Sequence, residues 1–162
     1  MEENMIVKVN KKVRSFKDLK DMPRKGFVEL TQPDGEIFEM ELQAVDSATL
    51  DRINDKYDKS KPKQPVKMMK VAGSATPKPI QITDGVEYDE YNEKMKVNET
   101  LRMAELALSF MPESLRPEGS LEEQINELRN VLIAGHFVQI IKRGYEISGF
   151  NFEEKVEQAK NS

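Results

Sequence analysis

His136 is the only histidine of the 162-residue chain, and the chain has no cysteine. A catalytic histidine needs a nucleophile or a carboxylate within hydrogen-bond distance. Helical spacing instead gives His136 the neighbours Arg129, Gln139 and Arg143 on one face. A single histidine without cysteine also cannot supply the ligands of a zinc site. We therefore predict no catalytic residue and no enzymatic activity.

The acidic stretch from Asp84 to Glu90 is the next candidate for ligand chemistry. It does not have the spacing of oxygen ligands, central glycine and late glutamate that defines an EF-hand loop. Acidic side chains at the start of a helix are stabilised by the helix dipole, which explains the stretch without a metal. The chain has no glycine-rich phosphate loop and no GxSxG or HExxH motif. We expect no metal and no cofactor.

A lysine-rich segment at residues 59–78 could contact the phosphates of a nucleic acid. It contains no aromatic residue and no arginine, so base stacking and base readout have no side chains to perform them. A solvated linker explains the lysines better, and nucleic acid is not expected as a partner. Met68 and Met69 are adaptable apolar side chains within it. Either local packing or a segment that folds onto a partner accounts for them.

Residues 120–150 form the most apolar stretch and predict one long helix. Ser120 and Glu123 have the spacing of a capping box at its start. Glu122, Arg129, His136 and Arg143 recur every seven residues and would share one polar face of a continuous helix. This face would be the wet stripe of an otherwise buried helix.

The remaining predicted elements precede this helix. Alternating apolar and acidic residues on either side of Pro33-Asp34-Gly35 predict a β-hairpin over 26–44. Asp46 or Ser47 caps a short helix that ends near Tyr57, with Leu50, Ile53 and Tyr57 on its buried side. A second long helix runs from about Tyr88 to Met111, with an apolar stripe formed by Val97, Leu101, Ala104, Leu108 and Met111. The predicted fold class is α+β, mostly α, with an N-terminal hairpin, a short helix and two long antiparallel helices that form the core.

Residues 26–152 are expected to form a single domain. Residues 1–25 read as a flexible arm or an edge strand, with an apolar alternation at Met5–Val9. Residues 58–83 predict a mobile insert rich in lysine and proline, and residues 153–162 a charged tail.

The net charge of −4 is unevenly distributed. Residues 1–26 carry a net +4, residues 27–57 a net −6, residues 58–83 a net +5 and the rest a net −7. The basic segments could therefore meet acidic surfaces, either within the chain or on a partner. The N-terminus has no signal-peptide pattern, and no run approaches the roughly 18 apolar residues of a membrane span, so a cytosolic protein is expected.

Three short stretches near the C-terminus resemble one protein family. The run LIAGHF from Leu132 to Phe137, then Ile140-Ile141, then Ser148-Gly149-Phe150, is similar to the closing helix of XkdN-like phage tail assembly chaperones. The resemblance covers roughly residues 27–152. His136 stands where that family more often has an acidic residue.

The resemblance implies a non-enzymatic protein that binds the tape measure protein, keeps it soluble and helps to recruit tail tube protein. It also implies self-association, and a location in the host cytoplasm rather than in the mature virion. Recognition of an apolar helix in a groove is the physical route we expect. The expected partner-binding residues are Arg129, Leu132, His136, Phe137, Ile140, Arg143, Met68 and Met69.

Two other function classes compete with this one. A structural tail or virion component would be richer in strands than this sequence predicts. A nucleic-acid-binding regulator would use the two basic segments and bind with a steep dependence on salt.

Overall fold

The computed structural model describes residues 11–22 and 24–150, so the predicted Met5–Val9 arm and the charged tail lie outside the described residues. The fold is α+β and mostly helical, as predicted. The elements in chain order are α1 (Phe16–Lys20), β1 (Lys25–Thr31), β2 (Ile37–Gln43), α2 (Ser47–Lys59), β3 (Val66–Met69), β4 (Lys78–Gln81), α3 (Val86–Phe110), the 3-10 turn η1 (Glu113–Leu115), α4 (Leu121–Val131) and α5 (Ala134–Ile147).

Strands β1 and β2 form the predicted antiparallel hairpin. Its turn is closed by the backbone bond from Gln32 N to Glu36 O at 2.8 Å, and Gly35 adopts a φ of 89° that glycine tolerates. Alternate side chains, among them Val28 and Leu42, are buried on one face of the hairpin. The period-two pattern of the sequence therefore identified the face that packs on the helices.

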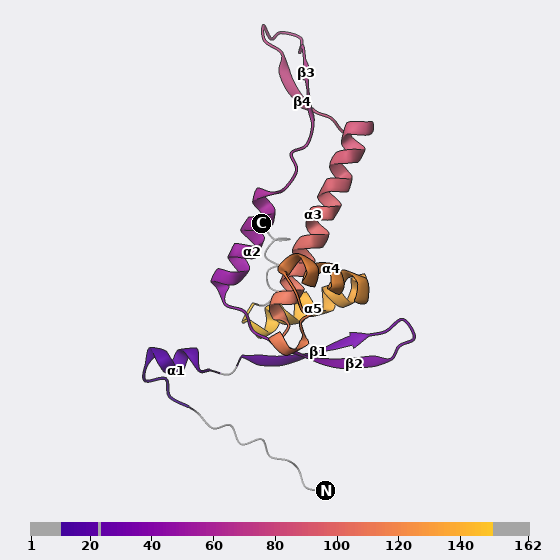
Figure 1. Ribbon diagram of the computed structural model, residues 1–162. Coiled ribbons are helices and arrows are strands. Elements are labelled where there is room, and N and C mark those ends of the chain that lie inside the picture. The colour runs from indigo at the N-terminus through magenta and orange to yellow at the C-terminus, as the bar shows by residue number, and fades with distance from the viewer. Residues whose placement is uncertain (1–10, 23, 151–162) are drawn as a thin grey trace.

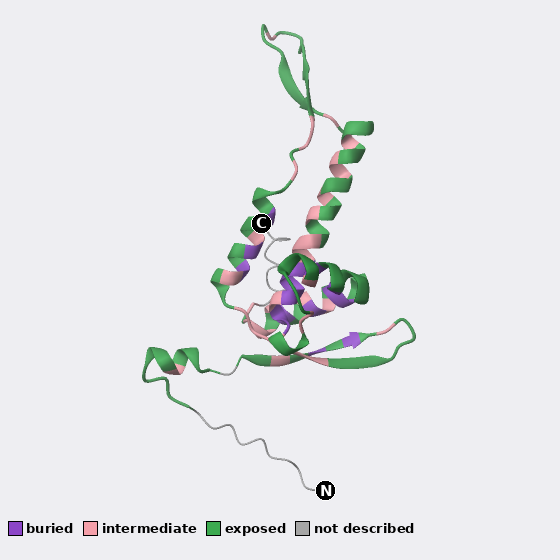
Figure 2. Ribbon diagram, viewed as in Figure 1, coloured by how far each residue is buried: buried purple, intermediate pink, exposed green. Residues whose placement is uncertain are grey.

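Helices α2 and α3 rise side by side from the hairpin (Figure 1). Asp46 caps α2 by accepting from Thr49 N at 2.8 Å, and Leu50, Ile53 and Tyr57 are buried along one side, as the spacing predicts. Helix α3 is buried only in its C-terminal half, whereas its half nearer to the β3–β4 ribbon is exposed or half-buried (Figure 2). This long helix therefore presents an uncovered surface outside the core.

The predicted continuous helix over 120–150 is wrong, because the chain leaves helical geometry at Leu132 and Ile133. Both residues are extended, with ψ of 139° and 160°. The predicted cap is present, since Ser120 Oγ accepts from Glu123 N at 3.3 Å. The break lets α4 and α5 each pack their own apolar side on α3. The seven-residue repeat consequently does not define one face.

Residues 58–83, for which the sequence predicted a mobile insert with local extended structure, contain a two-stranded antiparallel ribbon, β3 with β4. The ribbon projects from the end of the molecule opposite the β1–β2 hairpin (Figure 1). All eight of its strand residues are exposed. The short helix α1 was not expected from the sequence.

Candidate functional site

Helix α5 directs polar side chains at the free edge of β1. His136 Nε2 lies 3.2 Å from Thr31 O, and because a carbonyl oxygen only accepts, Nε2 carries the proton. Gln139 Oε1 accepts from Thr31 N at 3.2 Å, and Arg143 Nε donates to Phe27 O at 2.9 Å. These bonds satisfy backbone groups that an uncovered edge strand would leave open. Two residues of the predicted polar face thus hold the hairpin against α5.

His136 is buried, and its Nδ1 has no hydrogen-bond partner among the residues that the structure describes. Its recorded hydrogen bonds go to backbone groups, not to a nucleophile or a carboxylate. The geometry is that of a side chain that orients a strand edge.

The C-terminal residues predicted to bind a partner do not form one surface. Phe137 and Ile140 belong to the hydrophobic core, and Leu132 packs against it. Arg129 is exposed on α4, beyond the break that separates it from α5. A partner that approaches the folded protein can reach Arg129, whereas Phe137 and Ile140 are covered by the fold.

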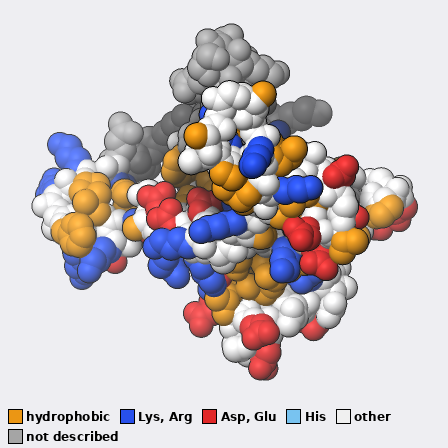
Figure 3. All heavy atoms as spheres, turned by 90° about the horizontal axis from the view of Figure 1, so that it is seen from above, with side chains coloured by type: hydrophobic (Ala, Val, Ile, Leu, Met, Phe, Trp, Pro, Cys, Tyr) orange, Lys and Arg blue, Asp and Glu red, His pale blue; other side chains and the backbone are white. Residues whose placement is uncertain are grey.

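Met68 and Met69 lie far from these residues, on the exposed ribbon (Figure 1). Met68 is 60 % exposed, and Val66, Met69 and Ile80 of the same ribbon are exposed as well. Figure 3 views the molecule from the ribbon end and shows hydrophobic side chains interspersed with lysine and arginine. A recess of about 530 Å³ separates one face of the ribbon from the start of α3, with Met69, Ile80 and Val86 in its lining.

A mainly apolar groove lies between the C-terminal end of α2 and the exposed part of α3. Its volume is about 470 Å³, and its lining is Tyr57, Ser60, Pro62, Glu93, Lys94, Val97, Asn98 and Leu101. Val97 is 50 % exposed although it belongs to the apolar stripe predicted for α3. We name this surface the α2–α3 groove. Sequence reasoning missed it, because the apolar stripe of α3, which begins at Val97, predicts that this side of the helix is buried.

A polar cluster fixes α2 against α3 beneath this groove. The carboxylate of buried Glu105 accepts from Lys56 Nζ at 2.7 Å and from the Tyr57 hydroxyl at 3.4 Å. The hydrogen bond to Glu105 raises the pKa of Lys56, and burial raises the pKa of the Tyr57 phenol. The Glu105 carboxylate and the Lys56 ammonium therefore form a structural ion pair between α3 and α2.

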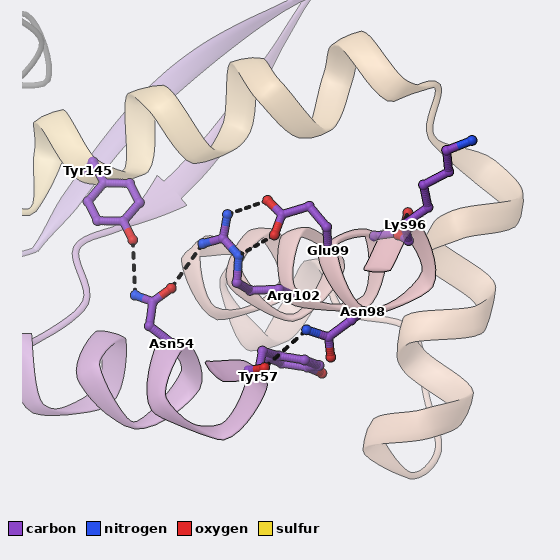
Figure 4. A network of polar contacts seen from close by, with 8 residues as sticks. Asn54, Tyr57, Lys96, Asn98, Glu99, Arg102 and Tyr145 are labelled. Carbon is purple, nitrogen blue, oxygen red and sulfur yellow. Dashed lines mark hydrogen bonds and ion pairs between the residues drawn. The ribbon is translucent and has the colours of Figure 1, made fainter. Parts of the chain in front are cut away.

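A second network joins three helices (Figure 4). Arg102 of α3 pairs with Glu99 and donates to Asn54 Oδ1 of α2 at 2.9 Å, and Asn54 Nδ2 lies 3.4 Å from the Tyr145 hydroxyl of α5. The hydrogen bonds from Arg102 hold the pKa of Glu99 below its ordinary value. These contacts set the spacing of α2 and α3, and hence the width of the groove.

A smaller cleft of about 280 Å³, with both polar and apolar lining residues, lies between the end of β2 and the start of α4. Two of its polar side chains are engaged by backbone carbonyl groups: Gln43 Nε2 donates to Ser109 O at 3.2 Å, and Arg116 Nε donates to Met111 O at 2.8 Å. Within residues 11–22 and 24–150 no group of three or more His, Cys, Asp or Glu side chains is placed to hold a metal ion. The helices found there include none that is both long and apolar enough to span a membrane.

Compared with protein-family models, curated proteins and solved structures, the sequence matches none of them.

Proposed function

We propose that this protein is a non-catalytic phage tail assembly chaperone that binds an apolar helix of the tape measure protein. The resemblance of the stretches from Leu132 to Phe150 to XkdN-like chaperones motivates the proposal. The observation that carries it is the α2–α3 groove, which is mainly apolar, open to solvent and formed by two helices that a polar network joins.

The chemistry of the groove suits a long helical partner. Tyr57, Pro62, Val97 and Leu101 provide apolar contacts at its base and walls. A partner helix could place residues spaced three and four apart against them, as in other helix-in-groove complexes. The exposed half of α3 would extend the contact beyond the groove itself.

Release is as important as binding for such a protein. Glu93 and Lys94 belong to the lining of the groove, so charged side chains border the apolar contact. A contact of this kind covers an apolar stripe without burying the large area of a permanent complex. We further propose that tail tube protein displaces the chaperone in the host cytoplasm, and that the chaperone does not remain in the virion.

Co-expression tests this function. The protein should keep a fragment of the cognate tape measure protein soluble, and Val97→Glu should abolish the effect by placing a charge in the groove. Thr100→Glu is the matched control, because Thr100 is exposed on the same helix but does not line the groove. Circular dichroism checks that both variants fold. If the fragment aggregates equally with and without the wild-type protein, the proposed function is wrong.

A further inference from the structure

Strand β2 has an open edge. Two backbone hydrogen bonds lie at the two ends of the β1–β2 ladder: Gln32 N donates to Glu36 O at 2.8 Å, and Ala44 N donates to Arg24 O at 2.6 Å. In an antiparallel ladder, hydrogen-bonded pairs alternate with pairs that are not hydrogen-bonded. The even-numbered residues of β1 and β2 therefore bond to each other, and the backbone N–H and C=O groups of the odd-numbered residues point away from the partner strand. Helix α5 covers the outer edge of β1, but among the described residues no recorded hydrogen bond reaches the outward backbone groups of Ile37 and Glu39.

The hairpin also carries unbalanced negative charge beside this open edge. Glu29 and Glu39 are directly opposite each other in the ladder, and like charges in this position destabilise a hairpin. Glu41 has a partner, Lys25 Nζ at 3.3 Å, but no ion pair within 4.0 Å engages Glu29 or Glu39 in the described part of the chain. Phe38, which directly precedes Glu39 in β2, is 50 % exposed. A strand that brings a cation and apolar side chains would complete this edge.

Strand β3 offers such an edge at the other end of the molecule. The bond from Ile82 N to Pro65 O at 2.9 Å sets the alternation in the β3–β4 ribbon, so Val66 and Met68 face outwards from β3. The outer edge of β4 contains Pro79, which has no N–H to donate. The ribbon can therefore be extended at β3, where Lys67 lies between two exposed apolar residues.

We propose that β3 of one copy adds in parallel to the open edge of β2 in a second copy, with Lys67 opposite Glu39. In a parallel pair, a residue whose backbone groups point at the neighbouring strand does not bond to the residue directly opposite. Its N–H and C=O bond instead to the two residues on either side of that opposite residue. Glu39 would thus bond to the backbone of Val66 and Met68 and face Lys67. Val66 then lies beside Phe38, and Met68 beside Met40, so charge pairs with charge and apolar with apolar.

The contact is between molecules, because the ribbon and the hairpin are at opposite ends of one copy (Figure 1). Each copy can pair its β3 edge with the β2 edge of one neighbour, and its own β2 edge with the β3 strand of another neighbour. Such a contact between two different surfaces builds a ring if it closes and an open chain if it does not. It requires no third protein, so it is testable independently of the tape measure protein.

The natural lack of cysteine allows a direct test of the register. Purified Glu39→Cys and Lys67→Cys proteins are mixed under a mild oxidant, and they should form an intermolecular disulfide, because neighbouring strands bring Cα atoms within disulfide range. Met68→Cys is the matched alternative, since it would face Glu39→Cys only in an antiparallel pair. Preferential crosslinking of Met68→Cys, or no crosslink with either, overturns the proposal.

Charge reversal tests the pairing by an independent measurement. Sedimentation over a range of concentrations should show association of the wild-type protein, weakened at least about tenfold by Glu39→Lys or by Lys67→Glu alone. The double variant should recover the association, whereas Glu122→Lys, which makes the same charge change on α4, should leave it unchanged. A wild-type protein that stays monomeric yet keeps the tape measure fragment soluble overturns this inference alone. An associating protein that leaves the fragment to aggregate overturns only the proposed function.

Discussion

Gly144 of α5 lies against the ring of Phe110 in α3 so closely that a Cβ at position 144 would be 2.3 Å from Phe110 Cγ. Phe110 is fully buried and also packs edge-on against Tyr145, with ring centroids 5.6 Å apart. The ring therefore has little freedom to move aside. This single contact sets how closely α5 approaches α3, and α5 in turn covers the edge of the hairpin.

Gly144→Ala should destabilise the protein by about 1–3 kcal/mol, because the added methyl group overpacks a filled core. Urea unfolding followed by circular dichroism measures the change. Gly135→Ala is the matched control in the same helix, since a Cβ there meets nothing within 4 Å. It should be neutral or stabilising by up to about 1 kcal/mol. Equal effects of the two variants would contradict the proposed role of the Gly144 contact.

Arg143→Met should lower the free energy of unfolding by about 0.5–1.5 kcal/mol, because the bond from Arg143 Nε to Phe27 O is lost. The methionine keeps most of the apolar stem, so the change reports on the hydrogen bond and on the ion pair with Glu146. Lys142→Met is the control, as Lys142 is exposed and forms no recorded hydrogen bond with another described residue. Should both variants unfold at the same urea concentration as the wild-type protein, α5 does not stabilise the β1 edge through this side chain.

Local signals were sufficient to predict much of the fold. The alternation around Pro33-Asp34-Gly35 predicted the hairpin. The predicted caps, Asp46 or Ser47 for one helix and Ser120 for the other, predicted where α2 and α4 begin. These features depend on residues close in sequence, whose geometry is determined by backbone and side-chain chemistry within a few positions.

Features that depend on distant contacts were not predictable in this way. The stretch through Leu132 and Ile133 is apolar enough for a continuous helix, and only the need of α4 and α5 to pack separately on α3 accounts for the break. The role of His136 at the β1 edge depends on Thr31, 105 residues away. The α2–α3 groove likewise exists because nothing in the described chain covers Val97.

Glu99→Gln should reduce the loss of stability in acid. Arg102 lowers the pKa of Glu99 below its ordinary value of 4.5, so Glu99 contributes stability above that pH and loses it as the pH falls through its folded-state pKa. The difference in Tm between pH 7 and pH 3 should therefore be smaller in the variant than in the wild-type protein. Glu90→Gln, at an exposed position without a recorded ion pair, is the control. An unchanged difference in Tm would show that the pair with Arg102 contributes nothing to folding.

Tyr57→Phe should reduce the fall in the free energy of unfolding at alkaline pH. Burial raises the pKa of the Tyr57 phenol above its ordinary value of 10.0, so the folded state favours the uncharged form, and this contribution is lost as the pH rises through the folded-state pKa. Lys56, whose pKa is raised above 10.5 by its hydrogen bond to Glu105, adds a loss of the same sign. The variant should retain only the lysine contribution, so its free energy of unfolding should fall less between pH 9 and about pH 11. Urea unfolding at each pH measures the slope, and a slope equal to that of the wild-type protein would mean that the Tyr57 phenol ionises as readily in the folded chain as in the unfolded one.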